Sequence, residues 1–118
     1  MATTAVKSKE TRDVVIIELP EVLDYPTVNK IRDIMNKSID MGKPKIILDF
    51  TKVKEINSTG IGIIISRVRR AREKGGDIKI LKPKTEVRKI IEVMGADKIF
   101  DIVNNIEEGL SLFEMKID

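Results

Sequence analysis

Short runs of β-branched residues alternate along this sequence with longer segments of helical periodicity, and no other feature constrains the fold as strongly. A buried strand shows a short apolar run, whereas an amphipathic helix shows apolar residues every three or four positions. Four runs are predicted to be strands: Val14–Leu19, Lys45–Asp49, Asp77–Leu81 and Ile99–Val103. A weaker alternating strand, Thr3–Glu10, is expected to pair with the first of them across the turn Thr11-Arg12-Asp13.

Four helices are predicted in the segments between and after these strands. The first begins near Pro26-Thr27, where Pro suits the first turn, and ends before Gly42. The others span Ser58–Lys74, Pro83–Met94 and Ile106–Met115, and the glycine pair after Lys74 marks a helix C-terminus. Their apolar stripes are Val28, Ile31, Ile34, Met35 and Ile39; Ile61, Ile64, Ile65 and Val68; Val87, Ile90, Ile91 and Met94; and Ile106, Leu110 and Phe113.

This order of elements predicts an α/β sandwich built on a mostly parallel sheet. Strands that are separated by helices require crossover connections and run parallel, while the opening strand pairs antiparallel. The four helices then cover the faces of the sheet. A chain of 118 residues removes roughly 65% of its unfolded surface from water, which is enough for one core. We therefore expect a single domain over residues 1–118.

The sequence contains no His and no Cys, and this absence excludes several classes of function. It leaves no Cys/His metal site, no Ser-His or Cys-His nucleophile pair and no thiol redox couple. The 19 acidic residues are scattered among 22 basic residues, which disfavours an all-carboxylate metal site or glycosidase site. We expect no enzymatic activity, no metal and no cofactor.

The distribution of apolar and charged residues predicts a cytoplasmic protein that does not bind membranes. No apolar run approaches the ~20 residues that span a bilayer, and the first seven residues lack the apolar core of a signal peptide. Charged residues make up 35% of the chain, with both signs interspersed. This composition is typical of proteins from organisms that grow at high temperature, where ion-pair networks are more favourable.

The most informative polar segment, residues 57–60, lies between a predicted strand and an apolar helical run. Ser58 is predicted to be the N-cap of that helix, with its hydroxyl accepting from a free backbone N–H, an arrangement worth about 1 kcal/mol over Ala. Gly60 and Gly62 each cost roughly 1 kcal/mol within a helix, and capping does not explain them. Two explanations remain open: close packing of the helix start on the sheet, or close approach of a partner protein.

The segment Ile56-Asn-Ser-Thr-Gly-Ile-Gly62 resembles the Asp-Ser-Ser/Thr-Gly-Leu-Gly signature of STAS domains of the anti-sigma-factor antagonist type. The resemblance covers residues 10–115. Further landmarks that are similar to the family are Val15-Ile-Ile-Glu-Leu followed by Val22-Leu-Asp24, Lys45-Ile-Ile-Leu-Asp-Phe, Gly75-Gly76-Asp77 and Val87-x-x-Ile-Ile-x-x-Met-Gly95.

The resemblance implies a small switch protein that binds an anti-sigma factor, often itself a serine kinase, and so frees a sigma factor for transcription. Ser58 matches the residue that the partner kinase phosphorylates, which ends the interaction, and a metal-dependent serine phosphatase restores it. The domain is then a substrate without catalytic residues, and we expect a monomer when it is free. The partner-binding residues implied are Asp24, Asn57, Ser58, Thr59, Gly60 and Gly62.

Two positions in this region leave alternatives open. Asn57 stands where the family usually has Asp, so the side chain keeps its shape and loses a charge. Asp24 is either the cap of the helix that begins near Pro26 or a carboxylate that faces a partner near Ser58.

A basic run follows in the second predicted helix: Arg67, Arg69, Arg70, Arg72 and Lys74. These side chains form either a solvated face, favoured by the helix dipole near a C-terminus, or a partner contact. A nucleic-acid-binding domain is the less favoured alternative function, because no aromatic residue interleaves with the run as a stacking platform requires. Within the family, the alternative is a scaffold subunit of a stress-signalling assembly that binds sister STAS proteins.

Overall fold

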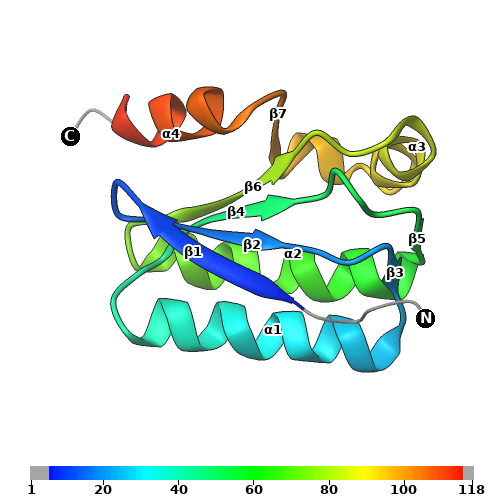
Figure 1. Ribbon diagram of the computed structural model, residues 1–118, viewed down its shortest axis with the longest axis horizontal. Coiled ribbons are helices and arrows are strands. Elements are labelled where there is room, and N and C mark those ends of the chain that lie inside the picture. The colour runs from blue at the N-terminus through cyan, green and yellow to red at the C-terminus, as the bar shows by residue number, and fades with distance from the viewer. Residues whose placement is uncertain (1–5, 116–118) are drawn as a thin grey trace.

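A five-stranded sheet forms the centre of the protein in the computed structural model, which describes residues 6–115. Its strand order is β1-β2-β4-β6-β7, and Figure 1 shows the strands between two layers of helices. β1 pairs with β2 antiparallel, and all the other neighbours in this sheet run parallel. The predicted α/β sandwich is confirmed. The strands are β1 (Lys7–Thr11), β2 (Val14–Glu18), β4 (Lys45–Asp49), β6 (Asp77–Leu81) and β7 (Asp101–Val103).

Within residues 6–115, four α-helices cover the sheet, as the sequence predicts. α1 and α2 run side by side on one face, and α4 lies on the opposite face (Figure 1). A 3-10 helix, Ala96–Lys98, connects α3 to β7. The helices are α1 (Tyr25–Asp40), α2 (Ser58–Glu73), α3 (Thr85–Val93) and α4 (Ile106–Glu114).

The alternation of side chains along each strand divides the core into two clusters. In β2, Ile17 points to the cluster that includes the α1, α2 and α3 side chains, whereas Ile16 points to the cluster under α4. In β4, Leu48 and Ile47 divide in the same way. Both faces of these strands are therefore buried, which explains why their sequences are continuous apolar runs.

The opening hairpin is shifted relative to the prediction. β1 begins at Lys7 and includes Thr11, so the turn consists of Arg12 and Asp13; residues 3–5 of the predicted strand lie outside the described residues. Both turn residues have positive φ, 48° and 67°, as a tight turn between twisted antiparallel strands requires. Arg12 donates to Glu107 of α4 at 3.0 Å, so the turn is tied to the helix that covers its face of the sheet.

Other element ends also differ from the prediction. The last strand begins at Asp101 rather than Ile99, because the 3-10 helix occupies the preceding residues. α3 is shorter than predicted at both ends, and Met94, predicted to face the core, is its C-cap and is exposed. Two short strands were not predicted from the sequence: β3 (Val22–Leu23) and β5 (Glu55–Ile56). They pair with each other in a separate two-stranded sheet.

Candidate functional site

The parallel pair β3–β5 brings together the two loops that the sequence analysis singled out. Val22 pairs with Glu55 and Leu23 with Ile56, and the side chains of Leu23 and Ile56 are buried. The residue that follows each strand is the N-cap of a helix: Asp24 for α1 and Asn57 for α2. The two helices therefore start side by side at the same end of the molecule (Figure 1). Asp24 and Asn57 therefore occupy equivalent positions.

Asp24 is the N-cap of α1. Its Oδ1 accepts a hydrogen bond from the Thr27 backbone N–H at 3.0 Å. Hydrogen bonds from the side chain and the backbone of Thr27 lower the pKa of Asp24 below its ordinary value. The capping interpretation of Asp24 is confirmed, and the residue is also exposed, so the same carboxylate is accessible to a partner.

Asn57, not Ser58, is the N-cap of α2, so the prediction for Ser58 was wrong. The Asn57 Oδ1 accepts from the Gly60 backbone N–H at 2.8 Å. Asn caps a helix as well as Ser does, and here it is the residue with extended backbone directly after β5. Ser58 is the first helical residue and is exposed, and its hydroxyl makes no hydrogen bond within residues 6–115. Its oxygen is therefore accessible and has no capping role.

The two glycines of α2 have different surroundings. A Cβ on Gly60 would lie 3.1 Å from Ile56 Cγ1 and 3.3 Å from Val28 Cγ2, so this glycine lets the start of α2 pack closely on β5 and α1. A Cβ on Gly62 would meet nothing within 4 Å. Internal packing therefore explains Gly60, which is buried, whereas Gly62 leaves open backbone that no internal contact requires.

A shallow groove of about 450 Å³ runs along the ends of β3 and β5. It includes two of the predicted site residues, Asp24 and Asn57, while Ser58 and Thr59 follow directly on α2 and are exposed. The residues that line the groove are Val22, Leu23, Asp24, Lys54, Glu55, Ile56 and Asn57.

The four arginines of the basic run make contacts within the chain. The Arg67 guanidinium donates to Asn36 Oδ1 at 2.8 Å, Arg70 forms an ion pair with Asp40, and Arg72 donates to Asp77 at 2.9 Å. Two of these contacts join α2 to α1, and Arg69 pairs with Glu73 along the exposed side of α2. These contacts within the chain favour the interpretation of the run as a solvated face over that of a partner contact.

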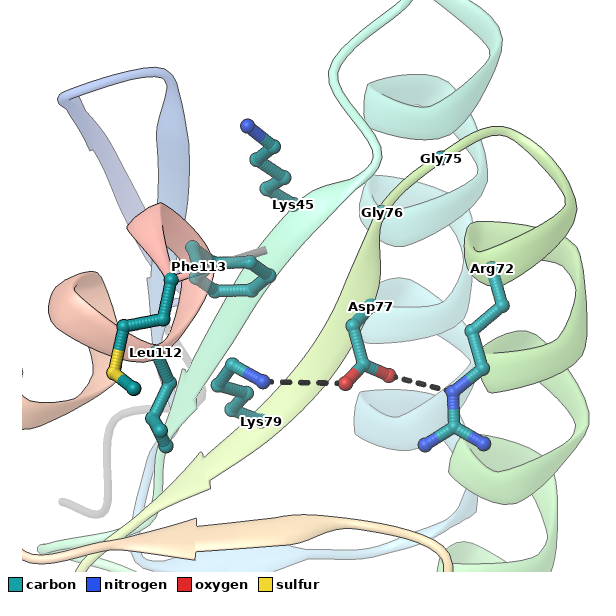
Figure 2. A pocket seen from close by; sticks show the side chains of 9 residues that line it. Lys45, Arg72, Gly75, Gly76, Asp77, Lys79, Leu112 and Phe113 are labelled. Carbon is teal, nitrogen blue, oxygen red and sulfur yellow. Dashed lines mark hydrogen bonds and ion pairs between the residues drawn. The ribbon is translucent and has the colours of Figure 1, made fainter. Parts of the chain in front are cut away.

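Sequence reasoning missed Lys79, a buried lysine in the middle of β6. Only 4% of the residue is exposed, and its ammonium donates to Asp101 at 2.7 Å. It also donates to Asp77 at 3.2 Å, as Figure 2 shows. It also lies 4.5 Å from the centre of the Phe113 ring. Lys79, Asp77 and Phe113 line a pocket of about 360 Å³ beside α4 and the loop that follows α2, at the opposite end of α2 from Ser58. Asp77 is 2 positions from Lys79 in the sequence, so this pairing was open to prediction, whereas Asp101 is 22 positions away and its contact depends on the fold.

Residues 6–115 contain neither a helix long and apolar enough to cross a membrane nor a group of three acidic residues placed to hold a metal ion.

A family model described as the STAS domain matches residues 5–109 of the chain. The chain belongs to the STAS domain family. Among curated relatives, the anti-sigma F factor antagonist of Paenibacillus polymyxa is 25% identical over 111 residues, covering 93% of this chain and 95% of that protein. The anti-sigma F factor antagonist of Lysinibacillus sphaericus is 29% identical over 86 residues, covering 72% and 74% respectively.

Solved structures of STAS proteins share this fold. The anti-sigma factor antagonist SpoIIAA in its unphosphorylated form superposes with a TM-score of 0.82 at 26% identity, covering 97% of this chain and all of that one. A crystal structure from Thermotoga maritima has a TM-score of 0.83 at 22% identity, covering 92% and 94% of the two chains.

Proposed function

We propose that this STAS domain is an anti-sigma factor antagonist whose binding to its partner is switched off by phosphorylation of Ser58. The observation that carries the proposal is the position of Ser58, an exposed hydroxyl at the start of α2 beside the loop that ends in Asp24. The relatives named as anti-sigma factor antagonists support the role. A structure of SpoIIAA in a phosphorylated form, 26% identical to this chain, supports the regulation.

In this proposal the partner is an anti-sigma factor that is also a serine kinase, and its capture frees a sigma factor for transcription. The kinase transfers a phosphoryl group from its own ATP to the Ser58 oxygen, and a metal-dependent serine phosphatase removes it. The chain supplies the acceptor hydroxyl and no catalytic group. It acts in the cytoplasm and binds no cofactor, nucleic acid or membrane.

The helix start tolerates a phosphate on Ser58. The group carries about −1.5 to −2 charge, and at a helix N-terminus an anion is stabilised by roughly 0.3–1 kcal/mol. Because the Asn57 side chain and not the Ser58 hydroxyl caps α2, phosphorylation leaves the hydrogen bond to Gly60 in place. The fold of the modified domain therefore stays intact.

The same phosphate opposes binding of a partner. A protein packed on the start of α2 would desolvate the dianion, and an unpaired buried charge costs several kcal/mol. In this interface Asp24, Asn57, Ser58 and Thr59 provide the contact surface, and the open backbone at Gly62 allows close approach. Gly60 acts from beneath, by letting α2 start close to β5.

The decisive experiment incubates the protein with the anti-sigma serine kinase of the same genome and ATP, and measures intact mass. The wild-type chain should gain one phosphoryl group and Ser58→Ala none, while Ser58→Ala still binds the kinase. Phosphorylated protein should melt within about 4 °C of the unmodified protein but bind at least about a hundredfold more weakly. Modification at another residue, or a large fall in melting temperature, would contradict this mechanism.

Gel filtration of the same samples tests the assembly. We expect a free monomer and a one-to-one complex with the kinase. Strong self-association of the free chain would instead favour a scaffold subunit of a stress-signalling assembly.

A further inference from the structure

The outward face of the β3–β5 pair presents an alternating set of side chains to solvent. Successive side chains on a strand point to opposite faces, and Leu23 and Ile56 point into the core. Val22 and Glu55, which lie opposite each other in the register, therefore point outward, and Asp24 and Asn57 directly follow the two strands. The two carboxylates, Asp24 and Glu55, both line the groove.

Two carboxylates and one ammonium line this groove, so its side chains carry a net negative charge. Asp24 and Glu55 are exposed, and neither forms an ion pair within residues 6–115. The one cation that lines the groove, Lys54, lies 3.6 Å from the carboxylate of Glu21. The Oδ1 of Asn57 already accepts a hydrogen bond from the Gly60 N–H, and a neutral amide attracts a cation less than a carboxylate does.

We propose that Glu55 is a specificity-determining residue of the partner interface, and that it accepts, together with Asp24, a lysine or arginine side chain of the anti-sigma partner. The inference rests on the proposed function. Asn57 is neutral, so it contributes no negative charge to the groove. Glu55, two residues earlier, is the acidic residue that β5 contributes to the groove. Half-buried Val22 offers an apolar surface for the aliphatic stem of the incoming cation.

The position of Glu55 predicts how it acts. A carboxylate at the exposed rim of an interface mainly accelerates association and sets its salt dependence, because it attracts the opposite charge before contact. Ser58 does not line the groove, so the proposed cation site and the phosphoacceptor are separate positions.

The test measures association and dissociation rates for the anti-sigma kinase of the same genome on immobilised wild-type protein, Glu55→Gln, Glu55→Lys and Glu73→Gln. Glu73 is a matched control because it is exposed at the far end of α2, about 22 Å along the helix from Ser58. At about 0.05 M salt, Glu55→Gln should associate roughly three- to tenfold more slowly, and Glu55→Lys more slowly still. At about 0.5 M salt these differences should shrink, because screening removes the attraction. Glu73→Gln should match the wild type.

Each outcome has a defined meaning. If wild type and Ser58→Ala bind the kinase but Glu55→Gln matches wild type in association rate and salt dependence, the role of Glu55 is overturned and the proposed function stands. If the wild-type chain does not bind the kinase, the proposed function falls and this inference falls with it. If Glu55→Gln melts at a lower temperature, Glu55→Asp decides: recovery of fast association supports the charge, and no recovery overturns it.

Discussion

Replacing Gly62 with Ala should make the protein more stable and a poorer binder. Gly62 is the fifth residue of α2, and an added Cβ would meet no atom within 4 Å, so the folded state accepts a methyl group without strain. Ala exceeds Gly in helix propensity by about 0.8–1.0 kcal/mol. The free energy of unfolding should therefore rise by about 1 kcal/mol.

The expected change in melting temperature follows from the size of the chain. Unfolding entropy is about 2.1 cal/mol/K per residue, or about 0.25 kcal/mol/K for 118 residues, so 1 kcal/mol corresponds to about 4 °C. Gly60→Ala is the matched comparison in the same helix. Its Cβ would approach Ile56 and Val28 to 3.1 and 3.3 Å, and this crowding offsets the gain in propensity. We expect Gly60→Ala to melt at or below the wild-type temperature.

The binding effect of Gly62→Ala has the opposite sign. If a partner packs on the open backbone of α2, the new methyl group should hold it away and weaken binding by about tenfold, a loss of about 1.4 kcal/mol. Thermal unfolding by calorimetry and titration with the anti-sigma kinase measure the two effects on the same samples. A more stable variant with full affinity would refute the partner role of Gly62. A less stable variant would refute the open surroundings deduced from the structure.

Substitutions at four other residues give three independent tests. Asn57→Ala removes the cap of α2 and should cost about 1 kcal/mol in urea unfolding, whereas Ser58→Ala should cost less than about 0.5 kcal/mol; equal costs would contradict the cap assignment. Asp24 has a lowered pKa in the folded state, so its stabilisation is complete above the unfolded value of about 3.9 and is lost as pH falls through the folded value. Asp24→Asn keeps a cap without this titration, so its stability should fall less steeply than that of wild type below about pH 4, and an unchanged acid profile would contradict this role. Lys79→Met should change the free energy of unfolding, measured with urea, by no more than about 1 kcal/mol, because Asp77 keeps its ion pair with Arg72 and Asp101 is exposed to solvent. A loss above about 3 kcal/mol would show that the ion pairs of Lys79 are essential for stability.

The sheet and the helices were predictable because each long element carries a complete hydrophobic period. β4 is an apolar run buried on both faces, and α1 places its apolar residues at helical spacing. β3 and β5 have two residues each, too few for any period, and their pairing depends on a contact between distant segments. The prediction of the α2 N-cap failed for a different reason. Asn57 and Ser58 are adjacent and both residue types are good N-caps, and the cap is Asn57 because β5 ends at Ile56, the residue before it.

The site itself was predictable only as two separate loops. The resemblance to STAS domains marked Asp24 and Ser58, but the sequence offered no means to separate the roles of Gly60 and Gly62. That distinction depends on the positions of Ile56 and Val28, which come from β5 and α1. Glu55 had no signal of its own, because its outward direction follows from the burial of its neighbour Ile56.

The pairing of Val22 with Glu55 joins positions 33 residues apart, and this has a consequence for what a partner is able to recognise. The proposed binding face is a discontinuous epitope that forms only after β3 has paired with β5 and α1 has packed beside α2. A peptide copied from residues 50–70 carries the phosphoacceptor serine but not the Asp24 side of the face. An unfolded or misfolded chain also lacks this surface. A partner that contacts both loops therefore binds only the folded domain, so correct folding is a precondition for signalling.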